Sequence, residues 1–402
     1  MASLPDSVDF AIIGGGILGL TLALELVERH QDAKVAILEK EVDCGLHASG
    51  RNSGVIHAGF YYTADSMKAR LTRIGNERLT RFCEQHALPL RKCGKLVVAR
   101  NESELAGLDE LLLRAERNGV QLESVSEQEA REIEPRVKTF ERALFSPTTS
   151  SADPSEVIRA LKALLVAKGV HLCFDTEVKA QRKGLLITTQ GELSVGYCVN
   201  AAGLQADRIA RQFGFCEHYR ILPFKGLYLY GDAQLEPLRT HIYPVPQLGM
   251  PFLGVHFTVT VDGRNKIGPT AMPALWREHY GGLSGFSLPE MGQVLATEAQ
   301  LFCSDASFRS LAWREMPKML RGTLVREASE LLHGVQPSQF KSWGRTGIRA
   351  QLVDRRSQRL VMDFCYEGDE HSFHILNAVS PAWTCSFALA ETFALEIERF
   401  LG

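Results

Sequence analysis

The most informative chemical motif in the sequence is glycine-rich, with Gly14, Gly16 and Gly19 at the spacing G-x-G-x-x-G. Residues 9–13 before it have the pattern of a short buried strand, and residues 17–29 after it carry apolar side chains at helical spacing. In that context Gly14 permits a tight turn, Gly16 lets the backbone approach a pyrophosphate, and Gly19 lets the helix pack on the sheet. The pyrophosphate would bind the unpaired N–H groups of the helix N-terminus, next to Ile17 and Leu18.

An acidic residue follows at the position where a dinucleotide site needs one. Residues 34–39 have the pattern of a second strand, and Glu39 lies 39 − 19 = 20 residues after Gly19. A carboxylate there can accept hydrogen bonds from ribose hydroxyls. The alternative is a glycine-rich turn that binds no ligand, but the strand, the helix and the acidic residue all stand at the spacing that a dinucleotide site requires. The first fifty residues therefore predict a dinucleotide-binding β-turn-α-β unit.

The choice between FAD and NAD rests on how many such sites the chain carries. The glycines of residues 281–285 have no strand before them, so a loop is expected there, and one fingerprint implies one dinucleotide. An N-terminal site followed by later returning segments favours FAD, whose ring system needs contacts from further along the chain. One such segment is VNAAG at residues 199–203, where Ala202 and Gly203 would let the backbone approach the cofactor; an ordinary strand-to-helix turn explains the same residues.

Composition limits the other classes of function. The chain has 402 residues, 45% of them hydrophobic and 23% charged, with a net charge of −2 and no basic block, so we expect a globular protein that does not bind nucleic acid. Its nine cysteines are scattered singly, which favours reduced thiols in the cytoplasm and argues against a metal site. The apolar stretch at residues 17–27 is too short to span a bilayer, and no secretion signal precedes it.

The remaining pattern predicts an α/β fold whose two domains are interleaved. A helix is expected over residues 154–168, a β-rich block over 224–270, a mostly helical block over 288–332, and a closing helix over 381–400. We expect a Rossmann-type FAD-binding domain and an α+β substrate domain with a mixed sheet. The FAD-binding domain is assigned to residues 1–80, 148–215 and 345–402, and the substrate-binding domain to residues 81–147 and 216–344.

Several blocks of sequence carry a family resemblance. The most specific is SGRNSGVIHAG at residues 49–59, followed by FYY at residues 60–62. The other blocks are SMKA at 66–69, HIYP at 241–244, MPFLGVHFT at 250–258, DG at 262–263, GPTA at 268–271, GIRAQ at 347–351 and NAVSPA at 377–382. Together they resemble the L-2-hydroxyglutarate dehydrogenases (also called oxidases), within the superfamily of FAD enzymes similar to D-amino-acid oxidase and glycine oxidase.

This resemblance implies FAD as the cofactor and oxidation of L-2-hydroxyglutarate to 2-oxoglutarate by hydride transfer. It also implies that electrons pass to a quinone or another acceptor, and that the protein associates peripherally with the inner membrane without a transmembrane segment. The alternative is an amino-acid or amine oxidase of the glycine-oxidase type, which has the same fold. A partner or tRNA-modifying flavoprotein would need a basic face, which the sequence lacks, and a nicotinamide dehydrogenase would lack a flavin spectrum.

Three residues are candidates for catalysis. Arg349 lies in the G-x-R segment that the related amine oxidases place over the flavin, and a guanidinium binds a carboxylate through two parallel hydrogen bonds. His57 and His256 are alternatives for the base that takes the hydroxyl proton, because imidazole titrates near neutral pH. His57 could instead orient the cofactor.

The expected binding residues extend around these three. For the substrate, including the second carboxylate of a five-carbon diacid, they are Tyr61, Tyr62, Lys68, Lys225, His256 and Arg349. For the cofactor, besides the residues of the glycine motif and Glu39, they are Lys40, Ser49, Arg51, Asn52, Ser53, Gly54, Val178, Ala202, Gly203, Arg349, Ser380, Pro381 and Ala382. Ser380 and Pro381 open the final helix, and N-capping by Ser380 is an alternative reason for their presence.

Overall fold

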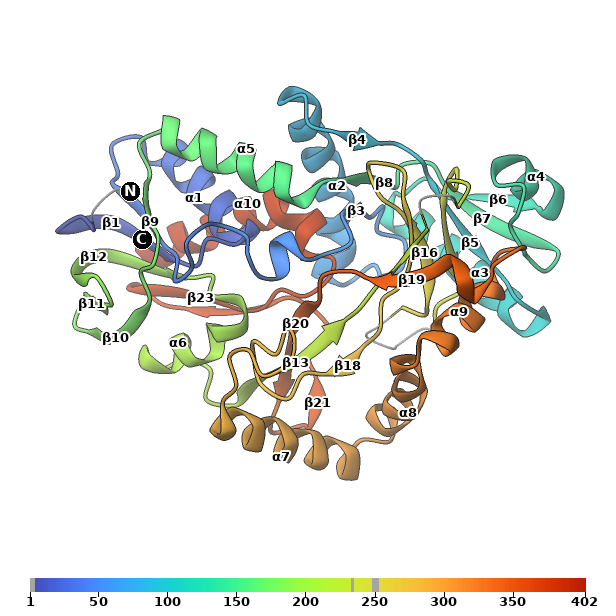
Figure 1. The fold of residues 1–402 in the computed structure, drawn as a ribbon. Helices are drawn as coiled ribbons and strands as arrows, with labels where there is room; N and C mark the ends of the chain where they lie inside the picture. Colours follow the sequence, from blue (N-terminus) through green and yellow to red (C-terminus); the bar gives the residue numbers. More distant parts are fainter. Residues whose placement is uncertain (1–3, 233–234, 248–252) are drawn as a thin grey trace. The chain divides into compact units, whose positions relative to one another are not determined.

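The computed structural model describes residues 4–232, 235–247 and 253–402, so residues 250–252 of one family-like block lie outside it. The chain forms two compact units (Figure 1). Unit 1 consists of Met1–Asn52, Pro154–Pro223 and Arg349–Gly402, and unit 2 of Ser53–Asp153 and Phe224–Ile348. Both units are discontinuous, as the sequence predicts for interleaved domains.

The units and the predicted domains divide the chain differently at four places, and the longest difference is residues 53–80; the other three are residues 148–153, 216–223 and 345–348. Residues 53–80 were assigned to the FAD-binding domain but belong to unit 2, because β3 (Val55–Ile56) pairs with β8 (Ser150–Ala152) of the same unit. Compactness does not determine which residues bind a cofactor. The predicted domain boundaries, as functional boundaries, therefore stay a prediction.

Unit 1 is built on an eight-stranded sheet with the strand order β10-β11-β12-β1-β2-β9, extended by β23 beside β12 and β22 beside β23. Its centre is parallel, with Phe10 of β1 opposite both Val35 of β2 and Tyr197 of β12. The strands are β1 (Ser7–Ile13), β2 (Val35–Leu38), β9 (His171–Cys173), β10 (Val178–Arg182), β11 (Leu185–Thr188), β12 (Gly191–Asn200), β22 (Cys365–Gly368) and β23 (Ser372–Asn377).

Helices cover both sides of this sheet (Figure 1). On one side α1 (Ile17–Arg29) packs against α5 (Pro154–Ala167) and α10 (Ala382–Leu401), and on the other α6 (Ala206–Gln212) follows η3 (Gly203–Gln205). A parallel sheet buried on both faces explains why β2 and residues 10–13 of β1 are apolar without interruption. The predicted strands and helices of this unit are confirmed, α1 with the expected bounds. The suggestion that Ser380 caps the last helix is wrong, because Pro381 occupies the N-cap position and makes no side-chain hydrogen bond.

Unit 2 contains a second eight-stranded sheet, in the order β19-β14-β17-β16-β15-β5-β7-β6, and a small sheet of β3, β8 and β4 (Leu90–Arg91). Its helices are α2 (Met67–Gln85), α3 (Leu105–Asn118), α4 (Glu127–Ile133), α7 (Leu288–Ser304), α8 (Ala306–Glu315) and α9 (Arg321–Ser329). The strands of the larger sheet are β5 (Lys95–Val98), β6 (Glu123–Ser126), β7 (Arg142–Ser146), β14 (Leu229–Gly231), β15 (His241–Pro244), β16 (His256–Val259), β17 (Asn265–Gly268) and β19 (Phe340–Trp343). The predicted β-rich and helical blocks are both confirmed.

Two further strands run from one unit into the other along the chain. In unit 2, β13 (Tyr219–Gly226) pairs with β18 (Met272–Pro273) through Phe224 and Pro273, and in unit 1, β20 (Gly347–Asp354) pairs with β21 (Arg359–Leu360). Short turns of 3-10 helix complete the fold: η1 (Ala48–Gly50), η2 (Glu102–Glu104), η4 (Met316–Met319) and η5 (Pro337–Gln339). Within the described ranges, every helix is too short or too polar to cross a bilayer.

Candidate functional site

The turn between β1 and α1 fixes two of its glycines sterically. Gly14 has a φ of +112°, and a Cβ placed on it would lie 2.6 Å from the carbonyl oxygen of Ala201. A Cβ on Gly19 would lie 2.0 Å from the carbonyl oxygen of Gly14. The first contact places the glycine turn against the small residues that follow β12. The predicted approach of Ala202 and Gly203 to the cofactor stays a prediction. A side chain at Gly14 or Gly19 would clash with backbone atoms, so only glycine fits there.

The N-terminus of α1 is left suitable for an anion. Gly16 is the N-cap and has no side chain to bond the helix, and the first turn carries no acidic residue. The Ile17 N–H donates a hydrogen bond of 2.8 Å to the Ser49 hydroxyl, a neutral group that does not cancel the positive end of the helix dipole. A pyrophosphate is the kind of ligand that such a helix end binds.

Glu39 lies directly after β2 and is almost fully buried, at 7% exposure. One carboxylate oxygen accepts the Gly15 N–H at 2.7 Å and the other accepts the Glu41 N–H at 2.9 Å. These two bonds hold the side chain against the glycine turn while leaving lone pairs on both oxygens. The carboxylate is therefore positioned to accept the ribose hydroxyls of a dinucleotide.

The other predicted cofactor residues of unit 1 fall into two groups. Near the glycine turn, Arg51 donates to the Leu46 carbonyl at 2.6 Å, Asn52 donates to the Ser49 carbonyl at 2.6 Å, and Lys40 pairs with the Glu41 carboxylate at 2.8 Å. The second group lies elsewhere in the unit. Val178 is part of its apolar core, Ser380 and Pro381 directly precede α10, and Arg349 is half-buried on β20. Their roles toward the cofactor stay predictions.

The larger sheet of unit 2 has two chemically different faces. On one face Leu96, Ile242, Phe257 and Ile267 pack into an apolar core together with Leu324 of α9. Because side chains alternate along a strand, the neighbouring residues of the same strands point to the other face. We call this second surface the polar face; its members are Lys95, His241, Tyr243, His256, Thr258 and Lys266. All six are buried, which is unusual for such residues.

Two histidines of the polar face are held in opposite tautomers. In His241, Nδ1 accepts the Val259 N–H at 3.1 Å, so the proton is on Nε2, which faces the Ser151 hydroxyl at 3.4 Å. In His256, Nδ1 lies 2.8 Å from the Gly254 carbonyl oxygen, which can only accept, so Nδ1 carries the proton. Neutral His256 therefore has its lone pair on Nε2, and its ring stacks on Tyr243 with centroids 3.7 Å apart. Of these two histidines, His256 is the one whose Nε2 can accept a proton.

The segment that follows β3 supplies the other predicted residues of unit 2. Burial, with Lys95 as the next largest cause, lowers the pKa of His57 well below 6.5, which leaves the ring neutral at physiological pH. The Tyr61 hydroxyl is buried, and Lys68 lies 5.9 Å from the ring centroid of Tyr62. Lys225 is half-buried on β13, and burial lowers its pKa to about 8.

Ser53 and Gly54, which were expected to contact the cofactor, begin unit 2. The Ser53 carbonyl accepts a hydrogen bond of 3.0 Å from the buried amine of Lys266, and the Gly54 carbonyl accepts one of 2.9 Å from Ala152. Burial lowers the pKa of Lys266 to about 8. These bonds connect the family-like segment to the polar face of the sheet.

Sequence reasoning missed Lys95, Tyr243, Thr258 and Lys266 as site residues. The signal was the alternation of polar and apolar residues in three strands, most clearly in HIY at residues 241–243 and HFT at residues 256–258. Such alternation normally indicates that the polar side faces water. A single sequence does not reveal that the segment after β3 covers that side here.

Comparison with known proteins identifies the family of this chain. The family model described as FAD dependent oxidoreductase matches residues 9–395. The chain belongs to this family of FAD-dependent oxidoreductases. Its cofactor is FAD, and the glycine turn, the uncapped start of α1 and the buried Glu39 fit the adenine dinucleotide part of that molecule.

Similar sequences cover nearly the whole of this flavoprotein. L-2-hydroxyglutarate dehydrogenase from Escherichia coli K12 is 31% identical over 98% of the chain and 94% of its own length. The mitochondrial L-2-hydroxyglutarate dehydrogenase of Homo sapiens is 33% identical over 98% of the chain and 89% of its own length, and that of Nematostella vectensis 35% over 98% and 91%.

Solved structures of the same fold are more distant in sequence. FAD-bound L-alpha-glycerophosphate oxidase from Mycoplasma pneumoniae has a TM-score of 0.78 at 22% identity, covering 98% of this chain and 95% of that one. Glycine oxidase from Geobacillus kaustophilus has a TM-score of 0.73 at 20% identity, with the same two coverages. These likenesses establish the fold of the flavoprotein.

Proposed function

We propose that this flavoprotein oxidises L-2-hydroxyglutarate to 2-oxoglutarate. The observation that carries the proposal is the similarity to L-2-hydroxyglutarate dehydrogenases, at 31–35% identity, over 95% or more of the chain. In this reaction C2 of the substrate loses a hydride, which carries both electrons, and its hydroxyl separately loses a proton. FAD, when bound, supplies the acceptor for the two electrons. The chain must bind the substrate and remove the proton.

His256 is the base that we favour for the hydroxyl proton. The Gly254 carbonyl holds the proton on Nδ1, so Nε2 is the nitrogen that can take another. The ring is 3% exposed and stacked on Tyr243, which fixes its orientation and keeps water away. His57, whose lowered pKa also leaves it neutral, is the alternative base. A matched pair of variants, His256→Gln and His57→Gln, distinguishes them by which one abolishes flavin reduction.

Arg349 is proposed to bind the carboxylate next to the reacting carbon. Its guanidinium is always charged and presents two parallel donors, whereas a lysine at the same place would offer a single point charge. Tyr61, Tyr62, Lys68 and Lys225 stay candidates for contacts with the rest of the diacid. An Arg349→Lys variant is expected to raise KM far more than it lowers kcat if the guanidinium binds ground state and transition state alike.

Anaerobic reduction of the flavin tests this function. Purified protein is mixed without oxygen with L-2-hydroxyglutarate, with its D-enantiomer, and with a panel of amino acids including glycine. We expect the flavin absorbance to bleach with the L-hydroxy acid only. Bleaching by an amino acid only would establish the alternative of a glycine-oxidase-type enzyme, and would contradict the proposal.

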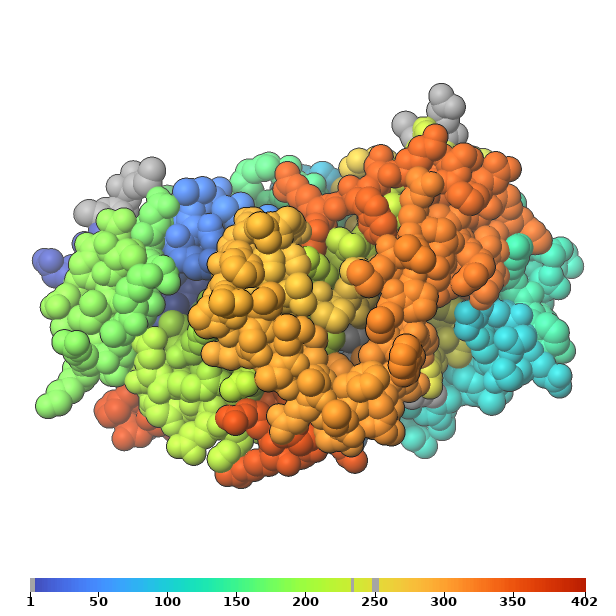
Figure 2. Space-filling model, turned by 60° about the horizontal axis from the view of Figure 1, so that its bottom comes forward, coloured from blue at the N-terminus to red at the C-terminus, as the bar shows by residue number. Residues whose placement is uncertain are grey.

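We further propose that the electrons pass to a quinone and that the protein binds the inner membrane peripherally. Support comes from four large apolar side chains at the end of α8 and in the turn after it: Trp313, Met316, Met319 and Leu320, each more than half exposed. Arg314 and Arg321 flank them, as suits an anionic lipid surface. In Figure 2 the orange residues of this helical segment form part of the molecular surface.

Vesicle flotation tests the membrane proposal. Binding to vesicles of phosphatidylglycerol and phosphatidylcholine is compared for the wild type, Leu320→Ser and Leu395→Ser, where Leu395 is an exposed leucine of α10. We expect only Leu320→Ser to reduce binding. Equal binding by all three proteins, or none by the wild type at any ionic strength, would contradict it.

A further inference from the structure

Lys95, the first residue of β5, has its amine inside a cage of aromatic rings. The side chain is 0% exposed. Its Nζ lies 4.5 Å from the ring centroid of Tyr243, 4.9 Å from that of Tyr61 and 5.2 Å from that of Phe60. Aromatic faces attract a cation at such distances. Burial of an ammonium without a hydrogen-bonding anion costs more than these contacts return.

The cage has no anion of its own. Among the residues that the structure describes, Nζ of Lys95 has no hydrogen-bond partner and makes no ion pair. The titratable groups that face it are His57 after β3, Cys93 before β5, and His241 and Tyr243 on β15. Burial keeps the Cys93 thiol and both histidines neutral, since it raises the pKa of the thiol to about 11 and lowers those of the imidazoles. Burial lowers the pKa of Lys95 itself to about 7.

A second polar atom in the wall of the cage is also without a partner. The Tyr61 hydroxyl is buried and makes no hydrogen bond within the described part of the chain. Burial raises the pKa of Tyr61 well above 10, so the hydroxyl keeps its proton and can donate it. Buried polar groups in folded proteins are nearly always hydrogen-bonded, so two unpartnered donors on adjacent side chains point to a missing acceptor.

We infer that Lys95 and Tyr61 bind a carboxylate of the substrate, namely the distal carboxylate that is not attached to the reacting carbon. This inference rests on the proposed function in one respect, that the substrate is a diacid. The carboxylate would supply the counter-ion that the chain lacks and accept hydrogen bonds from both Nζ and the tyrosine hydroxyl. Lys95 would then determine the preference for diacids over monoacids of equal length.

Two non-oxidisable ligands that differ only at the distal end test this site. Glutarate has the second carboxylate and pentanoate has a methyl group in its place. Their binding to the FAD-loaded protein is measured by calorimetry and by the change in the flavin spectrum, for the wild type, Lys95→Met, Tyr61→Phe and Lys341→Met. Lys341 is the control, because it is an exposed lysine on β19 of the same sheet.

The expected result is selective. Loss of a charge-assisted hydrogen bond should weaken glutarate binding by Lys95→Met on the order of tenfold to a hundredfold. Pentanoate binding should change by less than about twofold, and Lys341→Met should resemble the wild type. Tyr61→Phe should weaken glutarate binding on the order of fivefold, since it removes a neutral donor.

Proton uptake gives an independent signature. A bound carboxylate raises the pKa of the Lys95 amine, so glutarate binding at pH 8 should draw a proton from the buffer. Calorimetry in two buffers of different ionisation enthalpy measures this uptake. The wild type should take up a proton with glutarate and not with pentanoate, and Lys95→Met with neither.

Three outcomes would overturn the inference: unchanged glutarate binding by Lys95→Met, equal weakening of both ligands, or no glutarate binding by the wild type. Should Lys95→Met not fold, Tyr61→Phe and the proton uptake of the wild type decide the matter. The proposed function is tested separately by flavin reduction. A wild type that binds glutarate through Lys95 but is not reduced by L-2-hydroxyglutarate would refute the function and leave the site standing.

Discussion

The glycine turn of unit 1 and the polar face of unit 2 achieve their specificity in opposite ways. In the turn, the chain satisfies its own groups: Glu39 accepts two backbone N–H groups, the Ser49 hydroxyl accepts a third, and close backbone contacts exclude any side chain at Gly14. On the polar face, donors such as the amine of Lys95 are buried without an acceptor among the described residues. The first site is complete as a scaffold, whereas the second lacks a group that a ligand can provide.

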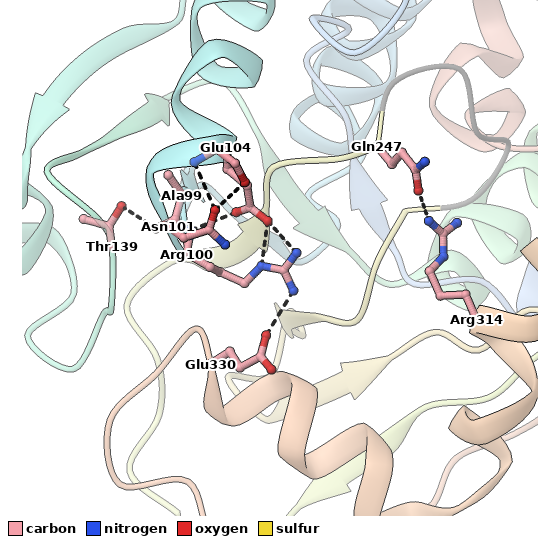
Figure 3. A network of polar contacts seen from close by, with 9 residues as sticks. Ala99, Arg100, Asn101, Glu104, Thr139, Gln247, Arg314 and Glu330 are labelled. Carbon is pink, nitrogen blue, oxygen red and sulfur yellow. Dashed lines mark hydrogen bonds and ion pairs between the residues drawn. The ribbon is translucent and has the colours of Figure 1, made fainter. Parts of the chain in front are cut away.

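Two cations at the ends of β5 show the same difference within one strand. Arg100, just after β5, donates to Glu104 at 2.9 Å and to Glu330 at 3.0 Å near the surface (Figure 3). Lys95, at the other end of the strand, is enclosed by rings, and its amine has no hydrogen-bonding carboxylate within residues 4–232, 235–247 and 253–402. Over those residues, the cation that connects elements of the fold is paired with carboxylates, and the cation that we assign to substrate binding is not.

The largest effect is expected from a substitution in the glycine turn, where close backbone contacts leave no room for a side chain. Gly14→Ala puts a Cβ 2.6 Å from the Ala201 carbonyl at a φ of +112°, so the backbone must shift away from the cofactor. FAD affinity should fall on the order of 100-fold. The flavin-to-protein ratio after gel filtration measures this, and Gly292→Ala, in an open position on α7, is the control. Full retention of FAD by Gly14→Ala would show that the turn is not so constrained.

The second-largest effect is expected from a pair of substitutions, one on each face of the larger sheet of unit 2. Phe257→Ala removes a fully buried ring from the apolar face and should lower the free energy of unfolding by about 3–5 kcal/mol. Thr258→Val, on the polar face, replaces a hydroxyl by a methyl group of similar size and leaves no cavity, so it should change the free energy of unfolding by only about 1 kcal/mol. Denaturant unfolding with saturating FAD measures both. Equal losses would mean that both faces serve packing alone.

The stability of the free enzyme should depend on pH through Lys95. Its pKa is about 7 in the fold and 10.5 without burial, so between these pH values the unfolded chain binds one more proton. Wild-type stability therefore gains from this group as pH rises through that window. Lys95→Met should raise Tm by roughly a few degrees at pH 6.5, and the gain should shrink towards pH 10. A gain independent of pH, or a loss, would assign Lys95 a structural role.

The smallest effect is expected at the surface network of Figure 3. Arg100→Met removes ion pairs whose partners are partly exposed, and such pairs contribute roughly 0.2–1 kcal/mol each. The free energy of unfolding should fall by about 1 kcal/mol at low salt and by less at high salt, with glutarate affinity unchanged. A weakened glutarate affinity in Arg100→Met would contradict the assignment of ligand binding to Lys95 and of a structural role to Arg100.

The elements of unit 1 could be predicted from the sequence because local signals coincide there. The glycine spacing, the helix over residues 17–29 and the acid at Glu39 all act within the first forty residues, and each of these elements was found where it was expected. Ser380 was misjudged as a helix cap, because the residue types do not reveal that the helix starts after Pro381.

The polar face could not be predicted, because its character depends on residues far apart in the sequence. Lys95 lies in no motif of the sequence, and the rings that enclose it come from the segment after β3 and from β15. Alternation in a strand does not indicate whether water or another segment covers its polar side. His57, Tyr61 and His256 entered the prediction through family-like blocks rather than through any local pattern.

A crystal structure of the FAD-loaded protein with glutarate bound tests the central claim most directly, because it locates the diacid itself. We predict one carboxylate within hydrogen-bond distance, about 3.2 Å or less, of both Nζ of Lys95 and the Tyr61 hydroxyl. A diacid bound away from the polar face, with the aromatic cage closed around an unpaired amine, would contradict it.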